Sequence, residues 1–135
     1  MLRCVIIDDS PHFLEAARCL LEGQGIAVVG VAADSGQALR QVERLRPEVV
    51  LVDIDLGTES GLELTRRLQH ETDPSPPPVI LISNYAEEDY GDVIEESAAA
   101  GFLAKSALSG DAIRTLLAEE DGNHQDDSFI EPRET

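Results

Sequence analysis

Short apolar runs alternate with segments of helical periodicity along residues 1–118. The runs are continuous and rich in Val and Ile, which is typical of strands that are buried on both faces of a sheet. Between the runs, apolar residues recur three and four positions apart, as on one face of a helix. The five predicted strands are Leu2–Ile7, Ile26–Val31, Val49–Val52, Val79–Ile82 and Phe102–Ala104.

Five helices are predicted, one after each strand. The first begins after Ser10-Pro11, a hydroxyl cap followed by a proline in the first turn. Strands that alternate with helices indicate right-handed crossovers, and therefore an α/β fold with a doubly wound parallel sheet covered on both sides. The helical stripes lie within Phe13–Leu21, Ala38–Leu45, Leu62–Leu68, Val93–Ala98 and Ile113–Leu117.

The chain is acidic and of single-domain length. Its 135 residues include 27 Asp and Glu against 10 Lys and Arg, a formal charge of −17. Such a surface repels phosphate backbones and anionic lipid, which argues against direct binding to nucleic acid or membrane and favours cations such as Mg²⁺. No apolar run reaches the length of a membrane span, so we expect a cytoplasmic protein.

Two further features complete this outline. Cys4 and Cys19 lack the number and spacing of a disulfide scaffold or zinc site, and both are predicted to be small buried residues. After Ala118 the alternating pattern ends, and residues 119–135 hold seven acidic side chains and one arginine. We therefore expect a domain over 1–118 and an acidic disordered tail or linker over 119–135.

Polar side chains follow four of the five predicted strands. In an open parallel sheet, sites form beyond the carboxyl ends of the strands. The second run alone ends in small apolar residues, Ala32-Ala33, as expected for a strand at the sheet edge. The candidate site residues are Asp8 and Asp9 after the first strand, Asp53 after the third, Ser83 after the fourth and Lys105 after the fifth.

This set of side chains suits phosphoryl transfer. Three carboxylates close together resist simultaneous ionisation, and a hard divalent cation, Mg²⁺ or alternatively Mn²⁺, removes that conflict. Lys105 could hold a phosphoryl oxygen, and the Ser83 hydroxyl could bond another. Asp53 would then be free to act as a nucleophile that forms an aspartyl phosphate.

Four segments of the chain resemble the receiver domains of two-component response regulators. The resemblance covers about residues 2–118 and implies a flavodoxin-like, five-stranded parallel sheet of order 2-1-3-4-5 with five helices. The segments are Ile6–Ser10, Val50–Leu56 followed by Gly61-Leu62, Ile80–Ser83 and Gly101–Lys105.

The resemblance implies a role for each polar strand-end residue. Asp53 matches the phosphoacceptor, and Lys105 matches the lysine that pairs with its carboxylate and then with the phosphoryl group. Asp9 matches a direct Mg²⁺ ligand and Asp8 a ligand acting mainly through water. Asp53 and the backbone carbonyl of Asp55 complete the implied metal site.

The resemblance also implies a switch and its partners. Ser83 matches the hydroxyl that moves to the phosphoryl oxygen, Phe102 the aromatic switch behind it, and Asp55 and Tyr85 the positions that tune dephosphorylation. The phosphodonor would be a phosphohistidine on a sensor histidine kinase or phosphotransfer protein. The face made by the fourth helix, fifth strand and fifth helix would then control a downstream protein or an output domain, with a homodimer left open.

Two positions depart from the family pattern. Ser106 stands where the family usually has a proline after the lysine, often with a cis bond. Either the strain of a cis non-proline peptide is tolerated here or the loop that carries Lys105 is rearranged. Gly57 stands where a proline is common four residues after the phosphoacceptor, which should loosen that loop. An extra carboxylate at Asp55 would either bind the metal more tightly or repel the phosphoryl group.

Two other functions compete with that of a phosphoacceptor regulator, whose own chemistry is limited to self-phosphorylation by small donors and autodephosphorylation. Asp53-Ile54-Asp55 also resembles the motif of haloacid-dehalogenase-like phosphatases, although that motif normally lies on the first strand. A pseudo-receiver would keep the fold and never take phosphate.

The sequence of Asp53–Leu62 resembles that of receivers that precede a helix-turn-helix domain and regulate transcription; no such domain fits after Ala118. We therefore expect either a stand-alone receiver or part of a longer regulator.

Overall fold

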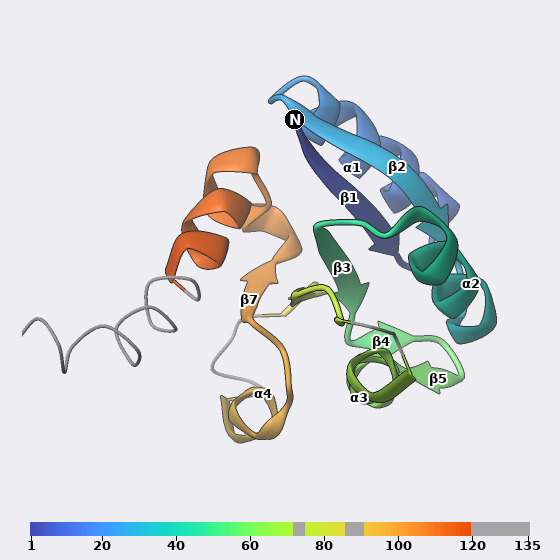
Figure 1. Cartoon of the computed structure of the whole chain (residues 1–135). Coiled ribbons are helices and arrows are strands. Elements are labelled where there is room, and N and C mark those ends of the chain that lie inside the picture. Colours follow the sequence, from blue (N-terminus) through green and yellow to red (C-terminus); the bar gives the residue numbers. More distant parts are fainter. Residues whose placement is uncertain (72–74, 86–90, 120–135) are drawn as a thin grey trace, which may run out of the picture.

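The computed structural model describes residues 1–71, 75–85 and 91–119. A five-stranded parallel sheet runs through the described part of the chain, in the order β2-β1-β3-β6-β7 (Figure 1). This is the predicted order 2-1-3-4-5, since β6 and β7 are the fourth and fifth strands of the sheet. The strands are β1 (Leu2–Ile7), β2 (Ile26–Ala32), β3 (Val49–Asp53), β6 (Val79–Ser83) and β7 (Gly101–Ala104).

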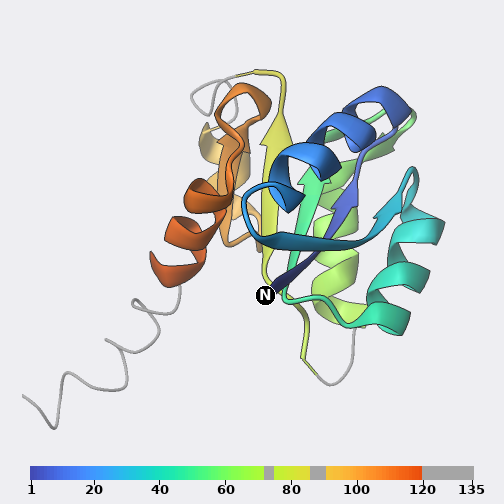
Figure 2. The ribbon, with the colours of Figure 1, turned by 90° about the horizontal axis from the view of Figure 1, so that it is seen from above.

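Helices cover both faces of this sheet (Figure 2). Helix α1 and a last helix over residues 110–119 contribute to the core on one face, and α2, α3 and α4 to the core on the other. The predicted α/β fold with five helices is therefore confirmed. The labelled helices are α1 (Pro11–Glu22), α2 (Ser35–Leu45), α3 (Gly61–Glu71) and α4 (Gly91–Glu96), with a short 3₁₀ helix η2 (Lys105–Ala107). Beyond residue 119, the predicted acidic tail lies outside the described residues.

The two hydrophobic cores explain why the strands read as continuous apolar runs. Side chains of β1 alternate between them: Val5 and Ile7 lie in the core beneath α2 and α3, while Cys4 and Ile6 lie in the core beneath α1. All four are fully buried. A strand covered on both faces has no solvent side to give a polar alternation.

Local sequence signals fix where the helices begin and end. The Ser10 hydroxyl accepts a hydrogen bond from the Phe13 amide at 3.2 Å and caps α1, with Pro11 in its first turn as predicted. The Asp34 carboxylate caps α2 in the same way, accepting from the Gln37 amide at 2.8 Å. Helix α2 ends at Arg46 in the left-handed conformation, with φ of 50°.

A small antiparallel hairpin between β3 and α3 was not predicted. It consists of β4 (Asp55–Leu56) and β5 (Glu59–Ser60), joined through Gly57-Thr58. Gly57 has φ of 76°, which glycine adopts without the steric cost of a Cβ atom. A glycine-containing two-residue turn is the signal that could have revealed the hairpin.

One of the two cysteine predictions is wrong. Cys4 is fully buried, and burial raises the pKa of its thiol to about 12. Cys19 is exposed because the buried side of α1 is occupied by Ala17 and Leu21, and Cys19 lies between them on the opposite side of the helix.

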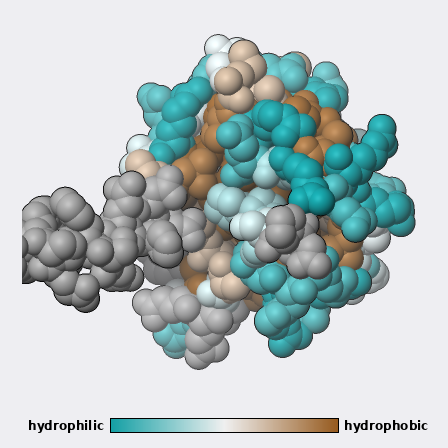
Figure 3. All heavy atoms as spheres, viewed as in Figure 1, coloured by the Kyte–Doolittle hydropathy of each residue, from teal (hydrophilic) through white to brown (hydrophobic). Residues whose placement is uncertain are grey.

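The surface is dominated by polar side chains. On the face seen in Figure 3, hydrophilic residues cover most of the described part, with apolar atoms visible between them. Within the described residues, no helix is both long enough and apolar enough to cross a membrane.

Candidate phosphoacceptor site

Strand register brings the predicted site residues to one edge of the sheet. Ile7 of β1 pairs with Val52 of β3, so the next residues, Asp8 and Asp53, are neighbours where these two strands end. Ser83 pairs with Ala104 at the ends of β6 and β7, and Lys105 follows directly. Asp53 pairs with Ile82 of β6, so pairing between neighbouring strands brings these four positions together, as the sequence predicts.

Lys105 lies between two buried carboxylates. Its Nζ is 2.6 Å from Asp8 Oδ2 and 3.2 Å from Asp53 Oδ2, and its side chain is only 12% exposed. The contact with Asp53 has hydrogen-bond geometry, whereas Asp8 Oδ2 has no hydrogen-bond partner despite the short ion-pair distance. Burial lowers the pKa of Lys105, but the two carboxylates beside its ammonium, Asp8 and Asp53, outweigh that effect, so the net pKa is raised.

Asp53 is held at both carboxylate oxygens and is poorly solvated. Oδ1 accepts a hydrogen bond from the Asp55 amide at 3.0 Å, and Oδ2 accepts from Lys105. Burial raises its pKa to about 6, helped by the charge of Asp8 and opposed by the Asp55 amide and by Lys105. The Asp53 carboxylate is thus buried at a cost that its two donors only partly offset.

Three carboxylates are arranged as a set of hard oxygen ligands. Oxygen atoms of Asp8, Asp9 and Asp53 all lie within 4.8 Å of one another. Asp8 is fully buried, while Asp9 is exposed at the mouth. Asp8 Oδ2 is buried and makes no hydrogen bond, although the Lys105 ammonium lies 2.6 Å away. Three carboxylates share this one ammonium, so the residues present fit a divalent metal as a second cation.

These residues line one hollow of about 230 Å³ at the strand ends. The hollow contains every predicted site residue except Phe102, which is 8% exposed and belongs to the core on the α2, α3 and α4 face of the sheet. Its lining consists of Asp8, Asp9, Ser10, Asp53, Asp55, Gly57, Ser83, Asn84, Tyr85 and Lys105.

Ser83 and Tyr85 lie on one side of this hollow. Ser83 is 3% exposed, and its hydroxyl accepts a hydrogen bond from the Tyr85 amide at 3.0 Å. The Tyr85 side chain is 62% exposed. Ser83 is therefore positioned by its own loop, with Tyr85 at the rim beside it.

Backbone packing explains the glycines of the loop after β3. A Cβ atom on Gly61 would lie 1.9 Å from the carbonyl oxygen of Asp53, so only glycine fits there. A Cβ on Gly57 would lie 3.0 Å from Asp9 Oδ2, in addition to its positive φ. The expected looser loop at Gly57 is instead the turn of the β4-β5 hairpin, and it borders the acidic hollow.

Ser106 does not prevent Lys105 from reaching the site. Lys105 begins η2, and the Leu108 amide donates to the Lys105 carbonyl at 3.3 Å. The lysine side chain still contacts both Asp8 and Asp53. The loop therefore places the ammonium without the proline that usually follows.

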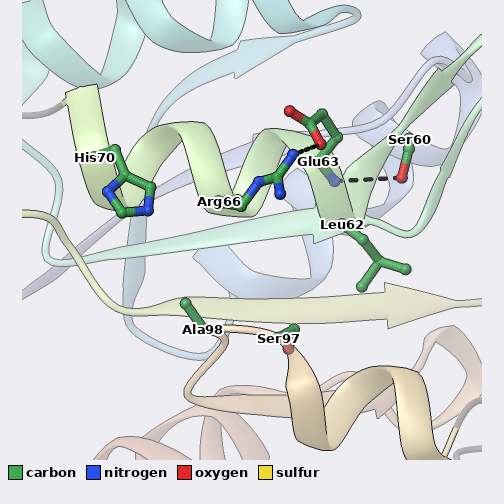
Figure 4. A pocket seen from close by; sticks show the side chains of 7 residues that line it. All are labelled: Ser60, Leu62, Glu63, Arg66, His70, Ser97 and Ala98. Carbon is green, nitrogen blue, oxygen red and sulfur yellow. Dashed lines mark hydrogen bonds and ion pairs between the residues drawn. The ribbon is translucent and has the colours of Figure 1, made fainter.

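A larger hollow of about 520 Å³ lies away from the acidic site, between α3 and the turn after α4 (Figure 4). It has more volume, but its lining contains a single acid, Glu63, and therefore no cluster of carboxylates. Glu63 is paired with Arg66. Chemistry, rather than size, therefore identifies the smaller hollow as the candidate site. The larger one is lined by Ser60, Leu62, Glu63, Arg66, His70, Ser97 and Ala98.

The fold and the acidic site together define a signalling receiver. The family model of the response regulator receiver domain matches residues 4–117. The chain therefore belongs to the response regulator receiver domain family. This assignment confirms the resemblance stated from the sequence and favours it over the phosphatase alternative.

Relatives of this chain carry different output activities. It is 38% identical over 84 residues to protein-glutamate methylesterase/protein-glutamine glutaminase 1 of Syntrophus aciditrophicus (strain SB), covering 62% of this chain and 23% of that protein. It is 26% identical over 121 residues to the DNA-binding transcriptional activator EvgA of Escherichia coli (strain K12), covering 90% of this chain and 58% of EvgA. The chain thus spans only part of the length of these curated relatives.

A solved response regulator shares this fold. The two-component response regulator of the LuxR family from Aurantimonas sp. SI85-9A1 superposes with a TM-score of 0.75 at 27% identity. The match covers 89% of this chain and 85% of that chain.

Sequence reasoning missed three parts of the site. Ser10 was predicted only as a cap, yet it lines the hollow and its amide donates to Asp8 Oδ1 at 2.8 Å. Asn84 was not singled out, although it directly follows Ser83 at a strand end. Phe13, predicted only as part of a helical stripe, has its ring against Lys105.

Proposed function

We propose that Asp53 accepts a phosphoryl group from a phosphohistidine of a sensor histidine kinase or phosphotransfer protein. An Asp53 oxygen attacks phosphorus, the phosphorus–nitrogen bond breaks, and its electron pair remains on the imidazole nitrogen, which takes up a proton. The observation that carries the proposal is the placement of Asp53 beside the Lys105 ammonium, with an oxygen within 4.8 Å of the Asp8 and Asp9 carboxylates. Positioning and charge neutralisation are the main requirements of this chemistry.

Mg²⁺, with Mn²⁺ as an alternative, would be held by Asp9, Asp8, Asp53 and the backbone carbonyl of Asp55. When bound, it would neutralise the negative charge that gathers at the phosphoryl oxygens. The chain's own residues do the rest. The Asp55 amide orients Asp53 Oδ1, and Lys105 holds Oδ2 on the other side.

Phosphorylation would act as a conformational switch. The phosphoryl group brings up to about two negative charges and strong acceptor oxygens next to Lys105 and Ser83. The Ser83 hydroxyl accepts a hydrogen bond from the Tyr85 amide. If this hydroxyl turns to donate to a phosphoryl oxygen, its hydrogen bond with the Tyr85 amide would change. Phe102 would repack behind it, and the face formed by α4, β7 and the helix over residues 110–119 would shift in population.

The output is proposed by analogy with the relatives. EvgA is a DNA-binding transcriptional activator, and the methylesterase relative is an enzyme. For this chain we propose control of a partner protein or of an attached output domain of either kind. Asp55 and Tyr85, both at the rim of the acidic hollow, would set the lifetime of the phosphorylated state.

Labelling by a small phosphodonor tests the proposal. Acetyl phosphate with Mg²⁺ should add one phosphoryl group per chain, detected by intact mass, and Asp53→Asn should abolish it. Asp55→Asn is the matched control, because it changes the neighbouring acid that lies two residues on and is exposed. Asp55→Asn should change the lifetime of the phosphoryl label, but the chain should still take up one phosphoryl group.

The same pair of variants separates the alternatives. A phosphatase would hydrolyse p-nitrophenyl phosphate through many turnovers and would lose that activity in Asp55→Asn. A pseudo-receiver would take no label in any variant. Persistent labelling of Asp53→Asn would remove Asp53 from its proposed role.

A further inference from the structure

The Lys105 ammonium has a third neighbour that belongs to neither carboxylate. Its Nζ lies 4.3 Å from the centroid of the Phe13 ring. At this distance a cation is attracted by the negative face of an aromatic ring. The attraction is stronger where water is excluded, and the Lys105 side chain is only 12% exposed.

Helix α1 holds Phe13 in this position. The Phe13 amide donates to the Ser10 hydroxyl in the first turn of α1, and the side chain packs against the core beneath that helix. The ring is therefore fixed by the helix cap and by the core.

The three neighbours match the donors of a lysine. An ammonium has three N–H groups and no acceptor. Two sides of the Lys105 ammonium meet Asp8 Oδ2 and Asp53 Oδ2, and the Phe13 ring occupies another. Without the ring, the two carboxylates alone would set the position of the ammonium. Asp8 Oδ2, at 2.6 Å from Nζ, is nearer than Asp53 Oδ2, at 3.2 Å.

We propose that Phe13 is a positioning residue for Lys105, which it holds by a cation–π contact in reach of the phosphoryl group on Asp53. This inference rests on the proposed function, since it concerns the same site. A lysine stem is flexible, and Ser106 follows Lys105 where a proline would stiffen the backbone. The ring on α1 supplies a fixed contact whose strength does not depend on the charge state of Asp53.

The test separates ring electrostatics from packing. Full-length protein is made with Phe13 replaced by 4-fluoro-, 3,5-difluoro- and pentafluorophenylalanine, which weaken the negative ring face step by step with little change in shape. The labelling rate with acetyl phosphate and Mg²⁺ should fall with each step, reaching roughly five- to thirtyfold for the pentafluoro ring. Phe13→Leu should be similarly slow, and Phe13→Tyr should restore most of the rate.

A second measurement does not need phosphorylation. Urea unfolding of the same fluorinated series should show a progressive loss of stability in the parent chain and no trend in a Lys105→Met background. Equal labelling rates across the series, or an equal trend in both backgrounds, would overturn the inference. Failure of the unsubstituted chain to take any label would instead count against the proposed function, while the unfolding comparison would still judge the Phe13–Lys105 contact.

Discussion

The two ends of the central sheet hold charged side chains in different surroundings. At the amino end, the Arg3 guanidinium donates to the Leu45 and Arg46 carbonyls at 2.6 and 2.8 Å, and the Arg3 amide donates to Glu48 at 2.8 Å. At the carboxyl end, Asp8 Oδ2 has an ion pair with Lys105 but no hydrogen bond, and burial raises the pKa of Asp53 to about 6.

The difference separates structural from functional use of charge. Arg3 lies in β1 and satisfies orphan carbonyls at the end of α2, so it joins that helix end to β1 in a stabilising arrangement. The acids at the other end crowd like charges in a poorly solvated place, which costs stability and prepares the site for cations and a phosphoryl group. Removing the Asp53 carboxylate should therefore raise stability and abolish labelling, whereas removing the Arg3 guanidinium should lower stability and leave labelling unchanged.

The largest effect is expected at a position of the carboxyl end where the constraint is steric. Gly61→Ala would place a methyl group 1.9 Å from the Asp53 carbonyl oxygen, and this backbone cannot yield without moving Asp53. We expect a loss of more than about 4 kcal/mol in the free energy of unfolding, measured by urea denaturation. Gly91→Ala is the control, because a Cβ there meets nothing within 4 Å. Similar losses in both variants would contradict the steric account.

Lys105→Met should have the next largest effect. It removes the cation between Asp8 and Asp53 and leaves two buried carboxylates that repel each other. We expect a loss of about 3 kcal/mol at neutral pH without divalent metal. Millimolar Mg²⁺ should narrow the difference from the parent chain, because a second cation would then meet the same oxygens. A loss that is independent of both pH and Mg²⁺ would mean that Lys105 acts through packing alone.

The strand order and the main site residues could be predicted from the sequence, whereas the hairpin after β3 could not. The strand order and the gathering of Asp8, Asp53 and Lys105 were predictable, because polar residues after buried parallel strands must meet at one edge. The edge position of β2 followed from Ala32-Ala33 in the same way. The β4-β5 hairpin was not predicted because its pairing is local and only two residues long on each side.

The contacts that refine each end were beyond the sequence. Arg3 reaches carbonyls more than 40 residues away, and no pattern of side chains identifies which carbonyls a helix end leaves free. Phe13 belongs to the apolar stripe of α1, and periodicity alone would assign it to core packing. Its contact with Lys105 depends on the angle at which α1 crosses the sheet, which periodicity does not contain.

Asp53→Asn should stabilise the metal-free protein while abolishing labelling. The pKa of Asp53 is raised from 3.8 to about 6, so the folded state holds the proton more tightly than the unfolded state. Stability therefore falls as pH rises between these values, and the full cost is present above about pH 6. We expect Asp53→Asn to gain about 1–3 kcal/mol at neutral pH, and the gain to vanish below about pH 4.

Urea unfolding across this pH range, with a chelator present, checks the prediction. Asp55→Asn serves as the control, because its carboxylate is exposed and its removal should change stability little. A gain for Asp53→Asn that stays constant with pH would show that ionisation of Asp53 is not its source.

The smallest effect is expected at the amino end of the sheet. Arg3→Ala leaves the Leu45 and Arg46 carbonyls without their side-chain donor, and water can replace it only in part because Arg3 is half-buried. We expect a loss of about 1 kcal/mol in the free energy of unfolding, partly restored in Arg3→Lys, with the rate of labelling by acetyl phosphate unchanged. The unchanged rate is the informative part, because it would show that the α2–β3 junction stabilises the sheet without affecting the acids at its other end. A labelling rate that fell together with stability would mean that the two ends are coupled through β1, whose residues lead directly from Arg3 to Asp8.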